Sequence, residues 1–219
     1  LNILASAKVD ALQSLYSAFG GDFERAWKSN VNKFLPREPD ADGNLISIDY
    51  ENKKKKIDPE KELENIQKDG IGIVTVLDKK YPKILKEIPH PPFLLYVRGS
   101  VDLLSSDCFG IVGTRALTDY GKQAAPKISK DIAAAGFTIV SGLAKGIDAL
   151  AHQAALDAKK PTIAVLGCGL SWNVFYPPQN KRLAQKIIES GGAIISEYGY
   201  GVSGSPITFP QRNRIISGL

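Results

Sequence analysis

Two glycine-containing turns carry the residue types that phosphate binding requires. The first is Gly113-Thr114-Arg115, and the second runs from Ser141 to Asp148 and contains Gly142 and Lys145. Each turn follows a short apolar run typical of a β-strand and precedes a helical pattern. Backbone N–H groups, a hydroxyl and a cation that gather after a strand form an anion site. Because turns at the carboxyl ends of parallel strands meet at one sheet edge, both turns are expected to bind one phosphorylated ligand.

The same turns have a structural interpretation. Arg115 could instead pair with a local carboxylate in an ordinary loop. The second, similar turn favours phosphate binding over that ion pair. Asp148 is expected to cap the helix that it begins. His152 lies four residues later on the same helical face, so a structural Asp148–His152 pair is predicted.

A third candidate segment, Phe209-Pro210-Gln211-Arg212-Asn213-Arg214, combines an aromatic ring with two guanidinium groups. Cations follow phosphates and rings stack on bases in sites for single-stranded nucleic acid, so the segment favours such a ligand. The structural alternative is a buried Phe209 with two surface arginines. Glu197 has no second acid, base or metal ligand close by in the sequence, and it is interpreted as structural.

Other familiar motifs are absent. Gly167-Cys168-Gly169 lacks the third glycine of a dinucleotide fingerprint, since Trp172 occupies the sixth position, and no G-x-x-x-x-G-K-[ST] segment exists. Tyr176-Pro177-Pro178-Gln179-Asn180 is expected to form a rigid loop into a helix, and the structural alternative is a plain helix start with proline at the first position. Two histidines and two cysteines without metal-ligand spacing predict no metal and no cofactor.

The composition favours an acidic partner. The formal net charge is +5 and the isoelectric point about 9.1, which suits nucleic acid better than a small acidic substrate. Cys108 and Cys168 are interpreted as reduced core residues of a cytosolic protein, and no apolar run is long enough to span a bilayer. The first residue is Leu and no Met occurs, so a trimmed start is expected. A helical pattern that begins at Arg214 breaks off, so a cut end is expected as well.

After residue 58, predicted strands and predicted helices alternate regularly along the chain. Apolar runs predict strands over 73–77, 93–97, 109–112, 137–140, 162–166 and 193–196, and helical patterns cover 58–70, 118–135, 147–158 and 178–190. Runs without alternation, separated by amphipathic helices, predict an α/β fold: a Rossmann-like parallel sheet covered by helices on both faces. Pro126 is expected to kink its helix or to force an irregular turn.

The first 57 residues differ in composition. Residues 1–36 predict a small all-helical module, with apolar residues at helical spacing and Asp22 as a helix cap. Residues 37–57 predict a polar linker, with a short strand over 45–48 and a solvated lysine run over 53–56. The predicted Rossmann-like domain then covers residues 58–219.

The ordered motifs together resemble those of the DNA processing protein A family, also called DprA or Smf. The resemblance covers roughly residues 58–219, and the helical start is similar to the family's small N-terminal module, of a SAM or helix-hairpin-helix kind. The segments that carry it are Tyr81-Pro82, Leu95-Tyr96-Val97-Arg98-Gly99, Val112-Gly113-Thr114-Arg115, Ser141–Asp148, Tyr176-Pro177-Pro178, Ser196-Glu197-Tyr198 and Phe209–Gly218.

This resemblance implies a bacterial protein, not an enzyme, that binds single-stranded DNA and helps to load the RecA recombinase during natural transformation or recombination. It implies a homodimer in the full-length protein. It places strand binding at Arg115 above all, and also at residues of the other two segments: Ser141, Gly142, Lys145, Phe209, Arg212 and Arg214. Gly113 and Thr114, in the turn of Arg115, complete the predicted phosphate-binding residues.

Two departures from the family pattern stand out. The family often has Gly-Leu-Asp before its Tyr-Pro-Pro segment, whereas this chain has Leu170-Ser171-Trp172-Asn173-Val174-Phe175. The family's Rossmann-like domain normally continues past the R-N-R segment, so the sheet is expected to be incomplete at its C-terminal end.

Two other functions remain open. A nucleotide-hydrolysing enzyme with a lysine-decarboxylase-like Rossmann fold would need a P-G-G-x-G-T-x-x-E segment, and nothing in residues 1–219 matches it. The other open function is that of an adaptor, in which the N-terminal helical module makes the main contacts. The dependence of affinity on salt separates strand binding from binding of one mononucleotide, because only strand binding neutralises several phosphates.

Overall fold

The computed structural model describes residues 9–30, 38–39, 45–46, 52 and 54–219. The chain forms two compact units, which divide between Asn65 and Ile66, inside helix α4 (Pro59–Lys68). Most of the linker predicted over residues 37–57 lies outside the described residues, and it stays a prediction.

The N-terminal unit contains the two predicted helices, α1 (Val9–Ala18) and α2 (Phe23–Lys28). Asp22 caps α2 as predicted, because its carboxylate accepts the backbone N–H of Arg25 at 2.8 Å. Strand β1 (Glu38–Pro39) pairs antiparallel with β2 (Leu45–Ile46), which is the described part of the predicted short strand.

Lys54 departs from the expectation of a solvated lysine run. Its ammonium group is half-buried and donates to the backbone carbonyls of Trp27 at 2.9 Å and Ser29 at 3.0 Å. This lysine therefore binds the end of α2, a contact that sequence composition does not reveal.

The second unit is built on a six-stranded sheet with the order β3-β4-β8-β7-β6-β5. In chain order, the strands are β3 (Ile71–Thr75), β4 (Leu94–Gly99), β5 (Cys108–Gly110), β6 (Thr138–Ser141), β7 (Thr162–Val165) and β8 (Ala193–Ser196). All six predicted strands are present, and each end either agrees with the prediction or shifts by one or two residues.

The strand directions correct the prediction of a parallel sheet. Strands β5 to β8 are parallel, but β4 is antiparallel to both of its neighbours, β3 and β8. The segment between β3 and β4 contains only the single-turn 3-10 helix η2 (Ile84–Lys86), and no α-helix carries the chain across the sheet. A buried strand has a continuous apolar sequence in either direction, so the sequence pattern does not distinguish the two.

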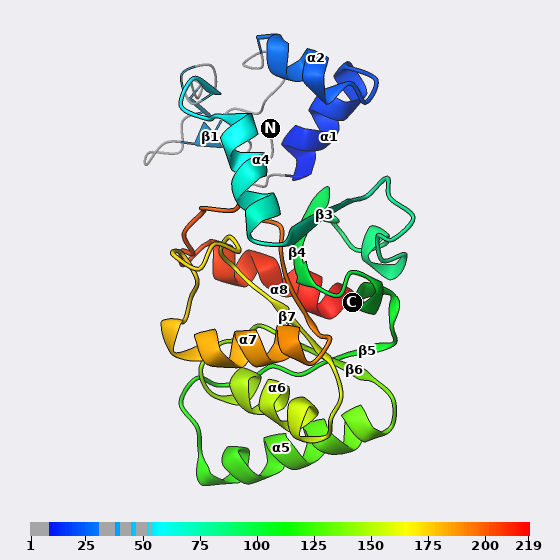
Figure 1. Cartoon of the computed structure of the whole chain (residues 1–219), viewed down its shortest axis with the longest axis vertical. Coiled ribbons are helices and arrows are strands. Elements are labelled where there is room, and N and C mark those ends of the chain that lie inside the picture. The colour runs from blue at the N-terminus through cyan, green and yellow to red at the C-terminus, as the bar shows by residue number, and fades with distance from the viewer. Residues whose placement is uncertain (1–8, 31–37, 40–44, 47–51, 53) are drawn as a thin grey trace. The chain divides into compact units, whose positions relative to one another are not determined.

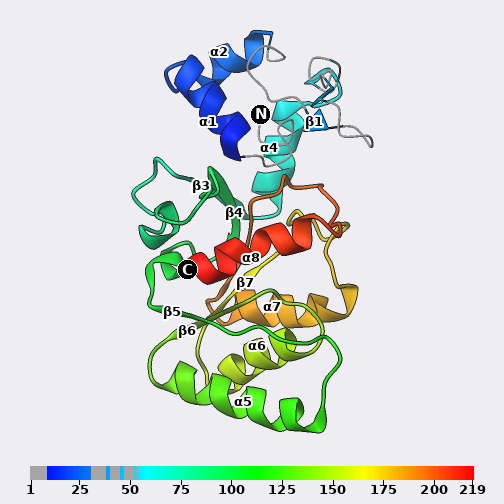
Figure 2. The same cartoon turned by 180° about the vertical axis from the view of Figure 1, so that it is seen from behind.

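Helices cover both faces of this sheet. One face carries α5 (Asp119–Ala134), α6 (Ile147–Asp157) and α7 (Lys181–Glu189), which lie together in the lower half of Figure 1. The opposite face carries α8 (Thr208–Gly218), which comes to the front in Figure 2. The 3-10 helices η3 (Asp102–Ser105) and η4 (Pro178–Asn180) complete the unit.

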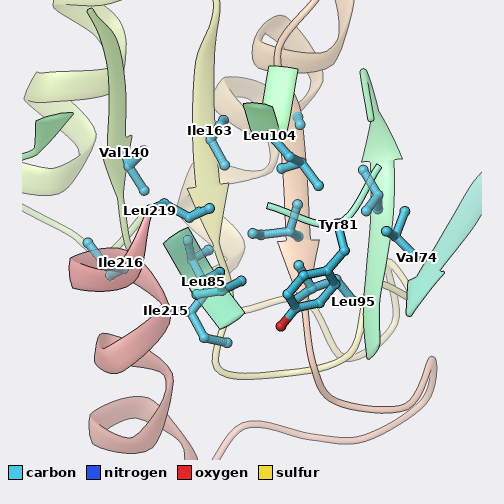
Figure 3. Packing of buried hydrophobic residues seen from close by; sticks show 14 residues of the cluster. Val74, Tyr81, Leu85, Leu95, Leu104, Val140, Ile163, Ile215, Ile216 and Leu219 are labelled. Atoms are coloured by element: carbon cyan, nitrogen blue, oxygen red, sulfur yellow. The ribbon is translucent and has the colours of Figure 1, made fainter. Parts of the chain in front are cut away.

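The central strands are buried on both sides, as the sequence predicted. Ile163 and Val165 of β7 point into the cluster beneath α8, whereas Ala164 between them belongs to the cluster on the α7 side. Figure 3 shows Ile215 and Ile216 of α8 against the first cluster, with Leu85 of η2 and Tyr81 among their neighbours. This packing fixes α8 on the sheet and so fixes the segment that begins it.

Two local expectations are decided by the helices themselves. Thr118 caps α5 by accepting the N–H of Gly121 at 3.1 Å. The helix then continues through Pro126 to Ala134 without an irregular turn, and of the two predicted effects the kink stays a prediction. The last helix begins at Thr208, six residues before the pattern that the sequence showed at Arg214.

Candidate functional site

A large cleft opens at the carboxyl ends of the parallel strands and has a volume of about 1490 Å³. Its walls come from the turns that follow β5 and β6, from the segment before η4 and from the first turns of α8. Residues from all of these elements line it, among them Gly113, Arg115, Ala144, Tyr176, Lys181 and Phe209. The cleft therefore lies where the sequence placed the ligand.

The N-terminal ends of three helices meet this cleft. Asp148 near the start of α6, Lys181 at the start of α7 and Phe209 near the start of α8 all line it. A helix N-terminus carries a partial positive charge and free N–H groups, so these three ends favour an anionic ligand.

Asp148 joins the two predicted phosphate turns. One carboxylate oxygen accepts the N–H of Gly113 at 3.3 Å, and the other accepts those of Gly142 at 3.2 Å and Ala144 at 3.4 Å. The expectation that the two turns meet is confirmed. The carboxylate achieves this by binding the backbone of both turns. The prediction that Asp148 caps α6 is wrong, because the helix begins at Ile147 with Gly146 as its cap residue and has no side-chain cap hydrogen bond.

The predicted Asp148–His152 pair is wrong. The ring of His152 is fully buried, and its Nδ1 lies 2.8 Å from the hydroxyl of Thr162, which itself donates to the carbonyl of Ile139 at 2.6 Å. Burial lowers the pKa of His152 to about 3, so the imidazole is neutral at physiological pH. The two side chains share a helical face but point to different partners.

The turn around Gly113 is held by close packing. A Cβ atom at Gly113 would lie 2.6 Å from Cγ1 of Ile147, so only glycine fits there. The hydroxyl of Thr114, which the sequence proposed as a phosphate donor, donates to the carbonyl of Ala116 at 3.1 Å and accepts that residue's N–H at 3.2 Å. Thr114 therefore closes the turn that presents Arg115.

Three cations on the cleft remain available to a ligand. Arg115 and Lys145 are exposed and Lys181 is partly exposed. Within the described part of the chain, none of the three makes a hydrogen bond or an ion pair. A small recess of about 30 Å³ beside the cleft is lined by Arg115 and Lys145 together. Two free cations around such a recess suit a phosphate group.

Arg212 has a different environment. Its side chain is buried, and Nη1 donates to the carbonyl of Gly142 at 2.8 Å and to the carbonyl of Val165, while Nε donates to Asn213 at 3.1 Å. Burial lowers the pKa of this guanidinium, and the nearby Asp148 carboxylate opposes that effect. Arg212 therefore ties α8 to the ends of β6 and β7.

Arg214 is paired as well. Its Nη1 and Nη2 donate to the two carboxylate oxygens of Glu197 at 2.6 and 2.5 Å, and Nε donates to the carbonyl of His90 at 2.9 Å. Burial lowers the pKa of Arg214, but the hydrogen bonds and charge of Glu197 outweigh it and the net shift is upward. Glu197 is structural, as predicted, whereas the alternative of two surface arginines is wrong.

An aromatic pair forms one wall of the cleft. The rings of Tyr176 and Phe209 lie with their centroids 5.4 Å apart and tilted by 43°. Tyr176 is 47% exposed, and Phe209 is half-buried because Gly167 and Gly204 lie against its ring. A partly exposed ring pair is a surface on which a base can stack.

The structure thus divides the predicted site residues into two groups. Arg115, Lys145 and Phe209 face the cleft or the recess beside it, and Gly113 and Gly142 shape the turns. Ser141 is buried beneath its turn. We call the ligand-facing groups the rim (Arg115, Lys145, Tyr176, Lys181 and Phe209) and the supporting groups the floor (Gly142, Asp148, Glu197, Arg212 and Arg214).

Sequence reasoning missed Tyr176 and Lys181. Tyr176 belongs to the loop predicted before the helix over 178–190, Lys181 belongs to that helix, and both line the cleft. That segment follows β7, so the rule that placed ligands at the carboxyl ends of parallel strands applied to it as well.

The described residues contain no group of three or more histidine, cysteine or acidic side chains that could hold a metal ion. Within those same residues, no helix is both long and apolar enough to cross a membrane.

Residues 72–219 match the sequence model of a family described as DNA recombination-mediator protein A. Protein Smf from Synechocystis sp. is 42% identical over 200 residues, which are 90% of this chain and 49% of that protein. DNA processing protein DprA from Streptococcus pneumoniae is 46% identical over 145 residues, which are 66% of this chain and 50% of that protein. The chain spans about half the length of the curated relatives that it matches.

Two solved structures are similar. The crystal structure of DNA processing protein A from Streptococcus pneumoniae superposes with a TM-score of 0.74 at 32% identity, covering 98% of this chain and 71% of that one. The second has a TM-score of 0.59 at 32% identity, covering 68% of this chain and 65% of that one. Its title describes the single-stranded DNA binding mode of DNA processing protein A from Helicobacter pylori.

Proposed function

Because this chain belongs to the DNA recombination-mediator protein A family, we propose that it binds single-stranded DNA in the cleft at the carboxyl ends of β5, β6 and β7. One observation carries the proposal: the exposed Arg115 and Lys145 lie without ion-pair partners among the described residues and share a recess with the Tyr176–Phe209 ring pair. Cations beside stacked rings match the alternation of phosphates and bases along a strand.

The rim supplies two kinds of contact. Arg115 offers a planar fork to a phosphate, and Lys145 and Lys181 offer point charges. The rings of Tyr176 and Phe209 offer a stacking surface of apolar character, which accepts any base. Because phosphate contacts dominate, we expect little sequence preference and a strong dependence of affinity on salt.

We propose that the cleft binds its ligand without chemical turnover. Asp148 is the acidic residue among the described residues that line the cleft. Its carboxylate oxygens already accept three backbone N–H groups from the two turns. A carboxylate in that position supports the shape of the site, which favours a binding role over that of a general base.

The biological role extends the binding proposal. We propose that the full-length protein is a homodimer in the bacterial cytoplasm that helps to load the RecA recombinase onto DNA strands during DNA uptake or recombination. The names of the relatives, DNA processing protein DprA and recombination-mediator protein A, support a role in strand handling. This role is tested by adding the chain to RecA on oligo-dT covered with single-strand binding protein: faster RecA ATP hydrolysis is expected, and an unchanged rate contradicts it.

Fluorescence anisotropy with labelled oligo-dT across a salt series tests strand binding. The unaltered chain is expected to bind with an affinity that falls steeply with salt. Arg115→Ala is expected to weaken binding by about tenfold or more and to reduce the salt slope by about one phosphate contact. Arg182→Ala is the matched control, since Arg182 is an exposed arginine of α7 that does not line the cleft.

Two results would overturn strand binding. One is a folded chain that leaves oligo-dT free at low salt, and the other is equal binding by Arg115→Ala. Shallow salt dependence with a mononucleotide, accompanied by its hydrolysis, would instead support a nucleotide-hydrolysing enzyme.

A further inference from the structure

Arg98 of β4 lies outside the cleft, yet it binds a segment that leads into it. Its Nη1 donates to the carbonyl of Asp69 at 2.7 Å, and its Nη2 donates to the Asp69 carboxylate at 2.8 Å and to the carbonyl of Leu170 at 3.0 Å. The guanidinium also lies over the ring of Trp172, 4.9 Å from its centroid. The side chain is 12% exposed, so these contacts are largely shielded from water.

The partners of Arg98 are themselves fixed. The carboxylate of Asp69, directly after α4, also accepts the hydroxyl of Tyr200 at 3.0 Å. The hydrogen bond from Arg98 holds the pKa of Asp69 below its usual value, so the pair stays charged at neutral pH. The N–H of Ser171 donates to the carbonyl of Tyr200 at 3.0 Å. We call Asp69, Arg98, Leu170, Trp172 and Tyr200 the Arg98 brace.

A chain of ring contacts connects the brace with the rim. The ring of Trp172 packs on Phe175 with centroids 5.3 Å apart, and Phe175 lines the cleft. The next residue is Tyr176, whose ring packs on Phe209. The segment from Leu170 to Tyr176 is therefore held by Arg98 at one end and presents the rim tyrosine at the other.

We propose that Arg98 is a positioning residue for strand binding, which holds the segment Leu170–Tyr176 so that the ring of Tyr176 stays against Phe209. The inference rests on the proposed function of the cleft. Arg98 does not line the cleft and contributes no phosphate contact. Its effect on a strand passes through Trp172 and the carbonyl of Leu170.

The contacts explain why an arginine stands at this position. A planar guanidinium donates to two carbonyls and a carboxylate while it stacks on an indole ring. A lysine ammonium supplies the charge and the cation–π contact, but it has no fork to reach both carbonyls. Arg98→Lys is therefore expected to restore part of the binding that Arg98→Met loses.

Salt dependence distinguishes positioning from direct contact with DNA. Arg98→Met is expected to bind oligo-dT about tenfold more weakly, as for the loss of one stacking contact, with the same salt slope as the unaltered chain. Arg115→Ala lowers the slope. Affinities are compared for the folded fraction, determined from thermal unfolding of each variant. Lys80→Met is the control, because Lys80 forms an exposed ion pair with Asp102 away from the brace.

A double-mutant cycle sharpens the test. Trp172→Leu is expected to weaken binding to a similar degree, and Arg98→Met combined with Trp172→Leu is expected to be no weaker than either alone, because both act through one contact. If the double variant lost the sum of the two single losses in affinity, Arg98 and Trp172 would act independently, which would contradict the inference. The pair Trp172→Leu and Arg98→Lys also decides the question if Arg98→Met fails to fold.

The outcomes separate this inference from the proposed function. If the unaltered chain leaves oligo-dT free, strand binding itself fails. If the unaltered chain binds and the Arg98 variants bind equally well, only the positioning role fails. A reduced salt slope for Arg98→Met would also overturn it, since Arg98 would then contact a phosphate.

Discussion

The rim and the floor of the cleft use arginine for opposite purposes. Arg115 on the rim is exposed and has no ion-pair partner within the described residues, whereas Arg212 and Arg214 on the floor donate to carbonyls and to a carboxylate. A guanidinium that already donates to protein acceptors has fewer N–H groups left for a phosphate. The comparison shows that the number of arginines in a motif says little about the number that can meet a ligand.

Arg212→Met should produce the largest loss of stability. It leaves the buried carbonyls of Gly142 and Val165 without their donor, and each unsatisfied buried group costs about 1–3 kcal/mol. We expect the free energy of unfolding in urea to fall by about 3 kcal/mol or more. Arg182→Met, on an exposed arginine, should change it by less than about 0.5 kcal/mol. An Arg212→Met variant with an unchanged free energy of unfolding would contradict the supporting role of Arg212.

Gly142→Ala should come next, because it places a Cβ atom 2.6 Å from Cζ of Arg212. The guanidinium is held by two carbonyls, so moving it away from the new Cβ atom breaks these hydrogen bonds, and the variant should cost about 1–3 kcal/mol, measured by urea unfolding. The control is Gly201→Ala, since no atom lies within 4 Å of a Cβ there. Equal stability of the two variants would contradict the packing of the floor.

Acid should destabilise the protein through His152, which lies buried beneath the floor. The folded protein keeps the imidazole neutral with a pKa of about 3, while the unfolded chain takes up a proton below pH 6.5. The contribution of neutral His152 to the free energy of unfolding is therefore fully present above pH 6.5, and it is lost as the pH falls toward 3. We expect a loss of about 2 kcal/mol at pH 5 relative to neutral pH.

The variants His152→Asn and His90→Asn test this assignment. The asparagine at 152 should flatten the pH dependence of the unfolding free energy between pH 5 and 7. His90→Asn should leave it unchanged, because His90 is exposed and has a positive φ of 55° that asparagine tolerates. If only His90→Asn flattened the pH dependence of the unfolding free energy, the assignment to His152 would be wrong.

Arg115→Ala should have the smallest effect on stability and so sharpens the comparison most. The exposed side chain makes no hydrogen bond within the described residues, so the free energy of unfolding should change by less than about 0.5 kcal/mol. The same variant should show the loss of strand affinity proposed above. A stability loss comparable with that of Arg212→Met would place Arg115 in the floor.

The sequence by itself determined the elements and the position of the candidate site. Apolar runs and helical periodicity depend on residues within one or two turns, so β8 was predicted with its observed ends and α5 to within one residue at each end. The glycine turns after β5 and β6 were found for the same reason. Their meeting at one edge follows from parallel strand direction, which the topology confirms.

Only the tertiary structure decided which of these residues can meet a ligand. Arg212 donates to a carbonyl 70 residues away, Arg214 pairs with an acid 17 residues away, and Asp148 binds a turn 35 residues earlier. The antiparallel direction of β4 and the packing of Tyr176 on Phe209 are likewise contacts between distant segments. Exposure and pairing are set by what the folded chain brings beside a side chain, and local sequence contains no record of those distant partners.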